Sequence, residues 1–166
     1  CDAAGVLLAE AWMTPFDARW RSAIDAVRSG LVGNVLDVDS SFTFTIGAES
    51  SNNYRWSADQ GGGALLDVGI YCLGPIVELW GAHPDLIDAT ALWHTTGVDA
   101  RTEATLEWVD GRQARIRCSF VDADEQRLEI IGRDASLVLA ADAHTGGVRA
   151  DTILLAPTDG RLRNVS

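Results

Sequence analysis

A carboxyl and a phenol one helical turn apart are the side chains of this sequence best suited to chemistry. Asp67 and Tyr71 follow the triplet Gly61–Gly63 in an apolar run that predicts a helix. Because residues four apart share a helical face, the two groups should be neighbours and could together hold and transfer a proton. The structural alternative is a first-turn carboxylate favoured by the helix dipole and a core tyrosine whose hydroxyl is satisfied locally.

The loop before the glycines supplies candidates for ligand binding. Residues 47–60 are polar and irregular and carry Tyr54, Arg55 and Trp56, and long loops with such side chains are often functional. Arg55 could contact a substrate or a cofactor phosphate, or form a surface ion pair. Trp56 could stack on a sugar ring or pack into the core, and the same two roles are open for Tyr54. The glycine triplet could also hold a phosphate, although it lacks the lysine of a phosphate-binding loop.

A single carboxylate, Glu10, interrupts an apolar stretch from Gly5 to Met13. The stretch predicts a buried strand of the kind found in parallel sheets. A carboxylate in such a strand needs a partner, which a cleft between two domains could provide. Ligand-like spacing is missing from the three histidines, His83, His94 and His144.

Composition excludes several classes of protein. The 166 residues, 47% hydrophobic and 22% charged, suit one globular domain. A net charge of -11 argues against nucleic acid as a partner. No apolar run reaches the length of about 20 residues that spans a membrane, and we expect a cytoplasmic protein. The sequence indicates neither a disulfide framework nor a metal site, because its cysteines are odd in number and far apart: Cys1, Cys72 and Cys118.

Hydrophobic periodicity predicts an α+β fold. We expect a helix over 15–29, capped by Gly30, and a second over 62–80 that Pro75 should kink or split. Alternation predicts strands over residues 35–46, 87–96, 100–109, 113–121, 128–131, 137–139 and 148–155. Helices that precede a run of antiparallel strands favour a largely antiparallel open-faced sheet with helices packed on one face.

The second face of the expected sheet is mixed and charged. Glu103, Glu107, Arg115 and Arg117 share a parity that suggests cross-strand ion pairs. A flat face of this kind is compatible with a subunit interface, and exposure to solvent is the alternative. We expect a homodimer or tetramer that forms through this open sheet face.

The glycine run, Asp67 and Tyr71 resemble the C-terminal domain of the glucose-fructose oxidoreductase family (Gfo/Idh/MocA oxidoreductases). Residues 10–13 resemble the segment by which these enzymes leave their dinucleotide domain. Residues 24–35 resemble the family's helix, glycine turn and first sheet strand, and residues 130–135 resemble a late hairpin. Residues 14–17 depart from the family's Arg-Phe-His-Pro-like segment, so the resemblance does not carry a substrate contact over to them.

The resemblance implies that this chain is the second half of an NAD- or NADP-dependent oxidoreductase. Family members bind the cofactor in an N-terminal Rossmann domain, and their C-terminal domain binds substrate and mediates oligomerisation. Residues 1–14 would be the tail of the first domain, with Glu10 near the cofactor, and residues 15–166 the second domain. All 13 basic residues are arginine, so the family's lysine would lie upstream and the isolated chain should be inactive.

A tyrosine at position 71 resembles the sub-group of glucose-fructose oxidoreductases, dihydrodiol dehydrogenases and some xylose dehydrogenases. Tyr71 would pass a proton to or from a substrate hydroxyl while a hydride moves between the adjacent carbon and the nicotinamide. Asp67 would orient the substrate or hold the lysine, and the substrate would be a sugar or diol contacted by Tyr54, Arg55 and Trp56. Without the resemblance, a non-catalytic α+β module for dimerisation or ligand binding remains the alternative.

Overall fold

The computed structural model describes residues 1–9, 11–47, 52–146, 153–157 and 163–165. Its helices are α1 (Ala18–Arg28), α2 (Ala64–Asp67) and α3 (Gly69–Trp80). Its strands are β1 (Val35–Thr45), β2 (Leu86–Trp93), β3 (Asp99–Glu107), β4 (Gln113–Ser119), β5 (Val121–Gly132), β6 (Ala135–Leu139), β7 (Ile153–Pro157) and β8 (Arg163–Val165).

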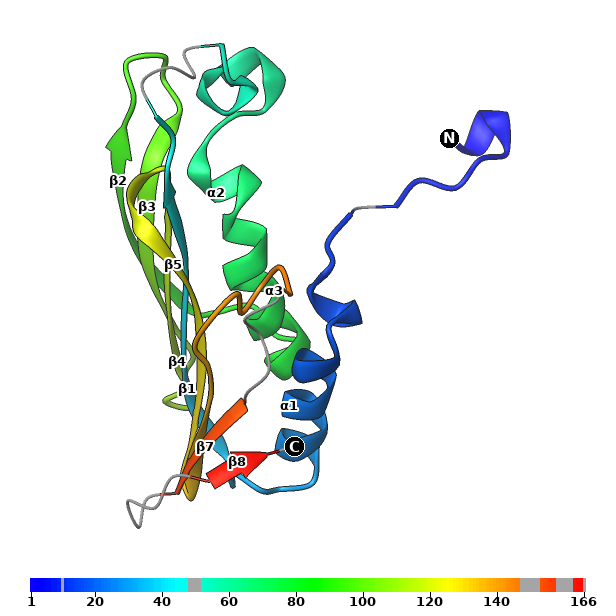
Figure 1. The fold of residues 1–166 in the computed structure, drawn as a ribbon, viewed down its shortest axis with the longest axis vertical. Helices are drawn as coiled ribbons and strands as arrows, with labels where there is room; N and C mark the ends of the chain where they lie inside the picture. The colour runs from blue at the N-terminus through cyan, green and yellow to red at the C-terminus, as the bar shows by residue number, and fades with distance from the viewer. Residues whose placement is uncertain (10, 48–51, 147–152, 158–162, 166) are drawn as a thin grey trace.

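The described strands form one sheet of order β2-β3-β4-β1-β5-β6-β7-β8, with the helices on one face (Figure 1). Every strand pairing is antiparallel except that of β1 with β4. A parallel pair needs a crossover connection, and α2 and α3 lie within the connection that follows β1. The α+β class with a largely antiparallel, open-faced sheet is therefore confirmed.

Strand β5 is much longer than expected. The sequence predicts strands that end at residue 121 and resume at residue 128, yet one strand runs from Val121 to Gly132. Charged residues obscure its alternation, but the strand pairs with β1 along that length, with Phe42 opposite Gln126 and Thr43 opposite Glu125. Backbone pairing with a central strand thus outweighs a polar sequence. Of the strand expected over 148–155, residues 148–152 lie outside the described part of the chain.

Helix α1 begins at Ala18 rather than at residue 15. Pro15 lies in a short 3-10 turn, and the Asp17 carboxylate then caps the helix by accepting from the backbone N–H groups of Arg19 and Trp20. The inner face of α1 packs against the sheet through Trp20 and Ile24, which are 1% and 4% exposed. The helix therefore fixes the chain that precedes it against the same core.

The second predicted helix is broken at Val68 and not at Pro75. Helix α2 ends at Asp67, Val68 caps it, and α3 continues through Pro75 without interruption. The segments Ala58–Asp67 and Gly69–Trp80 meet at an angle of 54°. In the described part of the chain, no single helix is long and apolar enough to cross a membrane, although this bent pair reaches that length and composition together.

The stretch from Gly5 to Met13 is not a buried strand. Its described residues extend away from the sheet (Figure 1), and Val6, Leu7 and Leu8 are 57%, 91% and 78% exposed. A strand requires a neighbour for its backbone groups, and this segment has no such neighbour among the described strands. Glu10, the candidate cofactor contact, lies outside the described residues.

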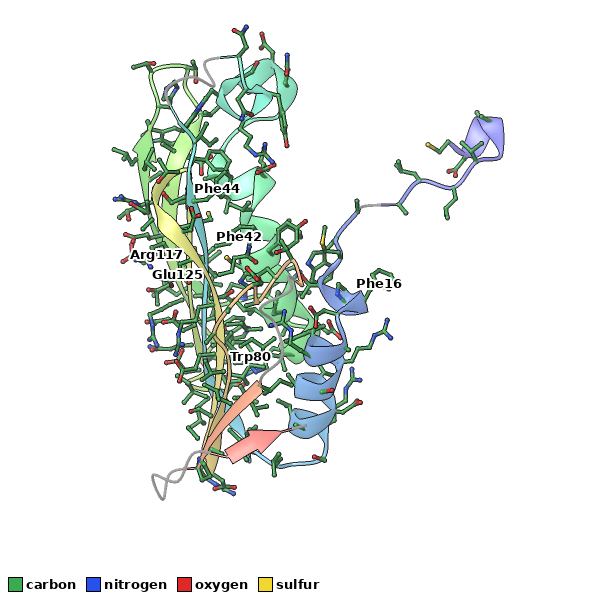
Figure 2. All side chains as sticks on the ribbon, in the orientation of Figure 1. Phe16, Phe42, Phe44, Trp80, Arg117 and Glu125 are labelled. Carbon is green, nitrogen blue, oxygen red and sulfur yellow. The ribbon has the colours of Figure 1, made fainter. Side chains whose placement is uncertain are left out.

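Ion pairs cover the open face of the sheet, but with other partners than the sequence suggests. Arg115 binds Asp37 and Asp39 at 3.0 and 3.1 Å, and Arg117 binds Glu125 at 3.1 Å. Figure 2 shows Arg117 and Glu125 on the side away from the helices. In the described structure, Arg115 of β4 binds carboxylates of the neighbouring strand β1, and Arg117 reaches across β1 to a carboxylate of β5.

Candidate active site

A cleft of about 640 Å³ opens where the helices meet the centre of the sheet. One side, the helical wall, consists of Asp67, Val68 and Tyr71. The facing side, the distal wall, consists of residues 124–126 of β5 together with Ala140, Ala141, Asp142 and Thr145. Phe42 and Phe44 of β1 line the cleft as well, and Figure 2 shows both on the helix-covered side of the sheet.

The Asp67 carboxylate is held by two side chains of the preceding loop. Arg55 Nε donates to Asp67 Oδ2 at 2.5 Å, and the Tyr54 hydroxyl donates to Asp67 Oδ1 at 2.9 Å. The pair is half-buried, with side-chain exposures of 14% for Asp67 and 29% for Arg55. The hydrogen bond to Asp67, followed by burial, raises the pKa of Tyr54. Arg55 thus fixes Asp67, which corresponds to the ion-pair alternative of the sequence analysis.

Tyr71 lines the same cleft from the first turn of α3. Its ring meets the Phe42 ring edge-on, with 5.4 Å between centroids and 71° between planes. The hydroxyl forms no hydrogen bond with any residue in the described ranges. The backbone N–H of Tyr71 donates to the Val68 carbonyl at 3.1 Å, across the break between the helices. The structure therefore brings Tyr71 and Asp67 to one wall, although they belong to different helices.

The glycine triplet serves close packing and does not form a phosphate site. A Cβ at Gly62 would lie 2.5 Å from the Arg55 carbonyl oxygen, and one at Gly63 would overlap the Asp99 carboxylate. The same carboxylate accepts from the backbone N–H of Leu65 at 2.8 Å. Since an acidic side chain already lies at the start of α2, the phosphate-cradle alternative is wrong.

Two of the candidate substrate contacts lie at or beyond the edge of the cleft. Tyr54 is linked to the cleft only by the hydrogen bond that its hydroxyl donates to Asp67. Trp56 stacks on His94, with 4.3 Å between ring centroids, and meets Phe120 edge-on at 5.4 Å. Trp56 therefore packs against the core, and among the described residues it is not part of the cleft lining.

His144 is the residue of this region that sequence reasoning missed. It is fully buried and stacks on Phe42, with 5.8 Å between ring centroids and 16° between planes. Its Nε2 lies 3.1 Å from the Ser41 carbonyl oxygen, and burial lowers its pKa to about 4, so the ring is neutral at pH 7. Spacing along the chain gives no signal for this contact, because it joins segments that are 103 residues apart.

Metal binding finds no support in the described residues, which contain no group of three His, Cys, Asp or Glu side chains able to hold an ion. The described cysteines are free thiols, and burial raises the pKa of Cys72 and of Cys118 to about 12. Neither thiol is therefore a nucleophile at neutral pH.

Comparisons with known proteins connect this cleft to a family. The family model described as the GFO/IDH/MocA C-terminal domain matches residues 20–138. The chain is 33% identical over 163 residues to the D-xylose 1-dehydrogenase (NADP(+)) 2 of Haloferax volcanii, covering 98% of this chain and 49% of that protein. It is 32% identical over 133 residues to the trans-1,2-dihydrobenzene-1,2-diol dehydrogenase of Sus scrofa, covering 77% and 38%.

The fold also occurs in a solved structure. The aldose-aldose oxidoreductase of Caulobacter crescentus, complexed with glycerol, superimposes with a TM-score of 0.84 at 23% identity over 100% of this chain and 49% of that one. The chain thus spans about half the length of these relatives. Family-model match, sequence identity and fold agree, and the chain belongs to the GFO/IDH/MocA C-terminal domain family.

Proposed function

We propose that this chain is the substrate-binding domain of an NAD(P)-dependent oxidoreductase that acts on a sugar or a diol. The observation that carries the proposal is the convergence of Tyr71 and Asp67 on one cleft in a chain of this family. Two relatives point the same way, since one is named an NADP-dependent xylose dehydrogenase and the other a dihydrodiol dehydrogenase. NADP is accordingly the first cofactor to test, and NAD the second.

In the proposed reaction, Tyr71 moves the proton. On oxidation, the hydroxyl on the reacting carbon would lose its proton to the Tyr71 oxygen, and a bound nicotinamide would supply the hydride acceptor. On reduction, Tyr71 returns the proton to the new alkoxide. The Tyr71 hydroxyl is suited to this role because no described residue engages it in a hydrogen bond. A proton donor or acceptor within reach of the substrate hydroxyl is what general acid–base catalysis requires.

Asp67 would orient the substrate hydroxyl beside Tyr71. Its two carboxylate oxygens each accept one hydrogen bond, from Arg55 and Tyr54, and each oxygen can accept another. The ion pair with Arg55 fixes the direction of the carboxylate. Arg55 itself would then act through Asp67 and not by contact with a phosphate.

The cofactor would be held mainly outside the described residues. Nicotinamide supplies the hydride acceptor or donor in this chemistry. The glycine triplet is filled by packing contacts, so the phosphates of the cofactor would need another domain. We propose that residues 1–14 are the end of that domain and residues 15–166 the second domain. The exposed side chains of Val6, Leu7 and Leu8 would then be covered by the first domain, as their apolar character favours.

The open sheet face is the proposed subunit interface. Its arginines are already paired with carboxylates at 3.0 to 3.1 Å, which lowers the cost of covering them. On β2, Leu86 and Leu92 add apolar surface, being 56% and 50% exposed. We propose a homodimer or tetramer formed through this face. We also propose a cytoplasmic location, where free thiols such as Cys72 and Cys118 persist.

The proposal is tested by assaying the complete protein with NADP and with NAD against a panel of aldoses, polyols and vicinal diols. The expected result is reduction of the nicotinamide, followed by its absorbance, with at least one member of the panel. Residues 1–166 alone should give no turnover under the same conditions. A complete protein that oxidises no member with either cofactor would favour the alternative of a non-catalytic binding module.

A further inference from the structure

The distal wall of the cleft is acidic, and its charge is not balanced. Asp124 and Asp142 line this wall, and Asp67 lines the wall that faces it. Glu125 reaches the cleft too, but its carboxylate binds Arg117 on the other side of the sheet. Among the described residues, Arg55 is the one cation of the lining, and Asp67 already binds it at 2.5 Å. Within the described lining, a ligand therefore meets several carboxylate acceptors and no cation other than the Arg55 that Asp67 binds.

Asp142 is held at this wall in a conformation that favours glycine. Its φ is 45°, the one positive value among the described residues other than glycine. Strained backbone persists where its surroundings fix it, and here Arg19 supplies the contacts. Arg19 Nη2 donates to the Asp142 carbonyl oxygen at 2.8 Å, and Nη1 donates to that of Ala141 at 2.9 Å.

The arginine that holds this segment is itself anchored. Arg19 pairs with Asp17 at 3.1 Å, and their side chains are only 11% and 12% exposed. Burial opposes ionisation of Asp17, but the hydrogen bonds from Arg19 prevail and lower the pKa of the Asp17 carboxyl. The Arg19 guanidinium is therefore engaged by the Asp17 carboxylate and by the two carbonyl groups. It is not one of the described residues that line the cleft.

Gln126 presents a donor next to these acceptors. Its Oε1 accepts from Thr145 Oγ1 at 3.0 Å and from the backbone N–H of His144 at 3.3 Å. With its oxygen engaged in this way, the amide has a fixed direction, and its NH2 group has no acceptor within the described ranges. The wall thus combines one fixed amide donor with the carboxylate of Asp142, which receives no hydrogen bond from a described residue.

We propose that this wall selects an uncharged, polyhydroxylated substrate, such as a free aldose or polyol, and rejects sugars that carry a phosphate or a nucleoside diphosphate. Asp142 is the residue that determines this specificity, by accepting hydrogen bonds from substrate hydroxyls. The inference rests on the proposed function, whose cleft it uses. Hydroxyl donors bind strongly to a carboxylate. A phosphate would instead lie beside Asp124 and Asp142, and the described lining residues offer it no cation except Arg55, which Asp67 already binds. Such unfavourable charge contacts discriminate between ligands.

The test compares neutral and phosphorylated sugars in the complete protein. With NADP as the cofactor, kcat/KM is measured for D-xylose, D-glucose, glucose 6-phosphate and dTDP-glucose. We expect a neutral sugar to exceed both phosphorylated compounds by about tenfold or more, since one hydrogen bond to a charged group has at least that value. Equal or higher kcat/KM for a phosphorylated sugar overturns the inference and leaves the proposed function intact.

If the complete protein turns over none of these sugars, their binding still tests the inference about the distal wall. Where none of the four compounds is turned over, saturation-transfer NMR on the complete protein measures their binding directly. Binding of D-xylose or D-glucose without binding of glucose 6-phosphate supports the inference. Comparable binding of glucose 6-phosphate, or no binding of either neutral sugar, overturns it.

The Asp142→Asn variant identifies the residue responsible. Asparagine adopts positive φ readily, so the backbone should be retained while the charge is lost. We expect KM for the neutral sugar to rise about tenfold with kcat within about twofold, and the discrimination against glucose 6-phosphate to fall. The matched control is Asp110→Asn in the exposed β3–β4 turn, which should behave as the wild type. An unchanged KM and an unchanged discrimination in Asp142→Asn would remove Asp142 from the proposal.

Discussion

The two walls of the cleft are built in opposite ways. In the helical wall, Asp67 and Tyr71 lie within one turn of each other in the sequence, on either side of the break at Val68. In the distal wall, β5 and the segment around Asp142 meet because Gln126 binds His144 and Thr145, 18 and 19 residues away. In our proposal the first wall performs the chemistry and the second selects the substrate.

Each wall also depends on its own arginine. Arg55 lies 12 residues from Asp67, whereas Arg19 lies 123 residues from Asp142. The Arg55 side chain is 29% exposed and that of Arg19 is 11% exposed. A local, more accessible pair can change with less effect on the fold than a half-buried arginine that joins distant segments. The comparison predicts that damage to the helical wall lowers the rate, and that damage to the distal wall raises KM and lowers stability.

The largest effect is expected from Tyr71→Phe in the complete protein. Loss of a positioned acid–base group should lower kcat by about 100-fold or more. Stability should hardly change, because the Tyr71 hydroxyl has no hydrogen bond with a described residue. The matched control is Tyr54→Phe, which loses its hydrogen bond to Asp67 and should change kcat by about threefold or less. Steady-state kinetics measure both, and an unaffected rate in Tyr71→Phe would exclude Tyr71 from proton transfer.

Acid should lower the stability of the fold through His144, whose backbone N–H donates to Gln126 of the distal wall. Because burial lowers the pKa of His144 to about 4 from an ordinary 6.5, the unfolded state binds more protons between these values. Stability is therefore complete above pH 6.5 and is lost as the pH falls to about 4, by roughly 3 kcal/mol in total. Urea unfolding at a series of pH values measures the loss.

The same experiment separates His144 from the other histidines. His144→Gln should reduce the slope of stability against pH in this window. His94→Gln is the control, since His94 directly follows β2, is half-buried and stacks on Trp56, and its replacement should leave the slope unchanged. A wild-type protein whose stability stays constant between pH 6.5 and 4 contradicts the buried, neutral state of His144.

Arg19→Met compares the two walls directly with Arg55→Met. Removing Arg19 leaves Asp17 buried without its cation and releases two carbonyl groups, at a cost of about 2 kcal/mol or more in the free energy of unfolding. KM should rise while kcat persists. Arg55→Met should cost about 1 kcal/mol or less and act mainly on kcat, through Asp67. Chemical unfolding and kinetics of both variants check the contrast, which a reversed order of stabilities would contradict.

The smallest effect on the cleft is expected from a change on the open face of the sheet. Arg115→Glu places a third carboxylate beside Asp37 and Asp39, which now bind Arg115. The cost should be about 1 kcal/mol, because the side chains of Arg115 and Asp39 are 45% and 43% exposed and that of Asp37 is half-buried. If the face is the subunit interface, the variant should nevertheless become monomeric. Light scattering coupled to gel filtration measures this change, with Arg112→Glu in the β3–β4 turn as the control. A wild-type chain that is monomeric at high concentration argues against the interface.

The sequence predicted some features of the fold correctly and missed others. Strand alternation and the Asp110-Gly111 turn are local features, and the structure has β3 and β4 paired antiparallel around that turn, with Leu106 opposite Ala114. The end of β5 nearest Val121 was missed because its stability comes from pairing with β1, which a polar sequence does not reveal. Pro75 was expected to kink or split a helix, yet α3 runs through it and the break lies at Val68, which has no missing N–H.

By itself, the sequence determined the fold class and the Asp67–Tyr71 pair. Residues four apart stay close along the chain, so Asp67 and Tyr71 share one wall although the single helix expected to carry them is broken at Val68. Only the tertiary structure decided that Arg55 binds Asp67, that His144 lies against Phe42, and that Arg19 holds Asp142 at the distal wall. Those contacts depend on sheet register and on the docking of α1, and these are set by cooperative packing of distant segments that leaves no periodic trace along the chain.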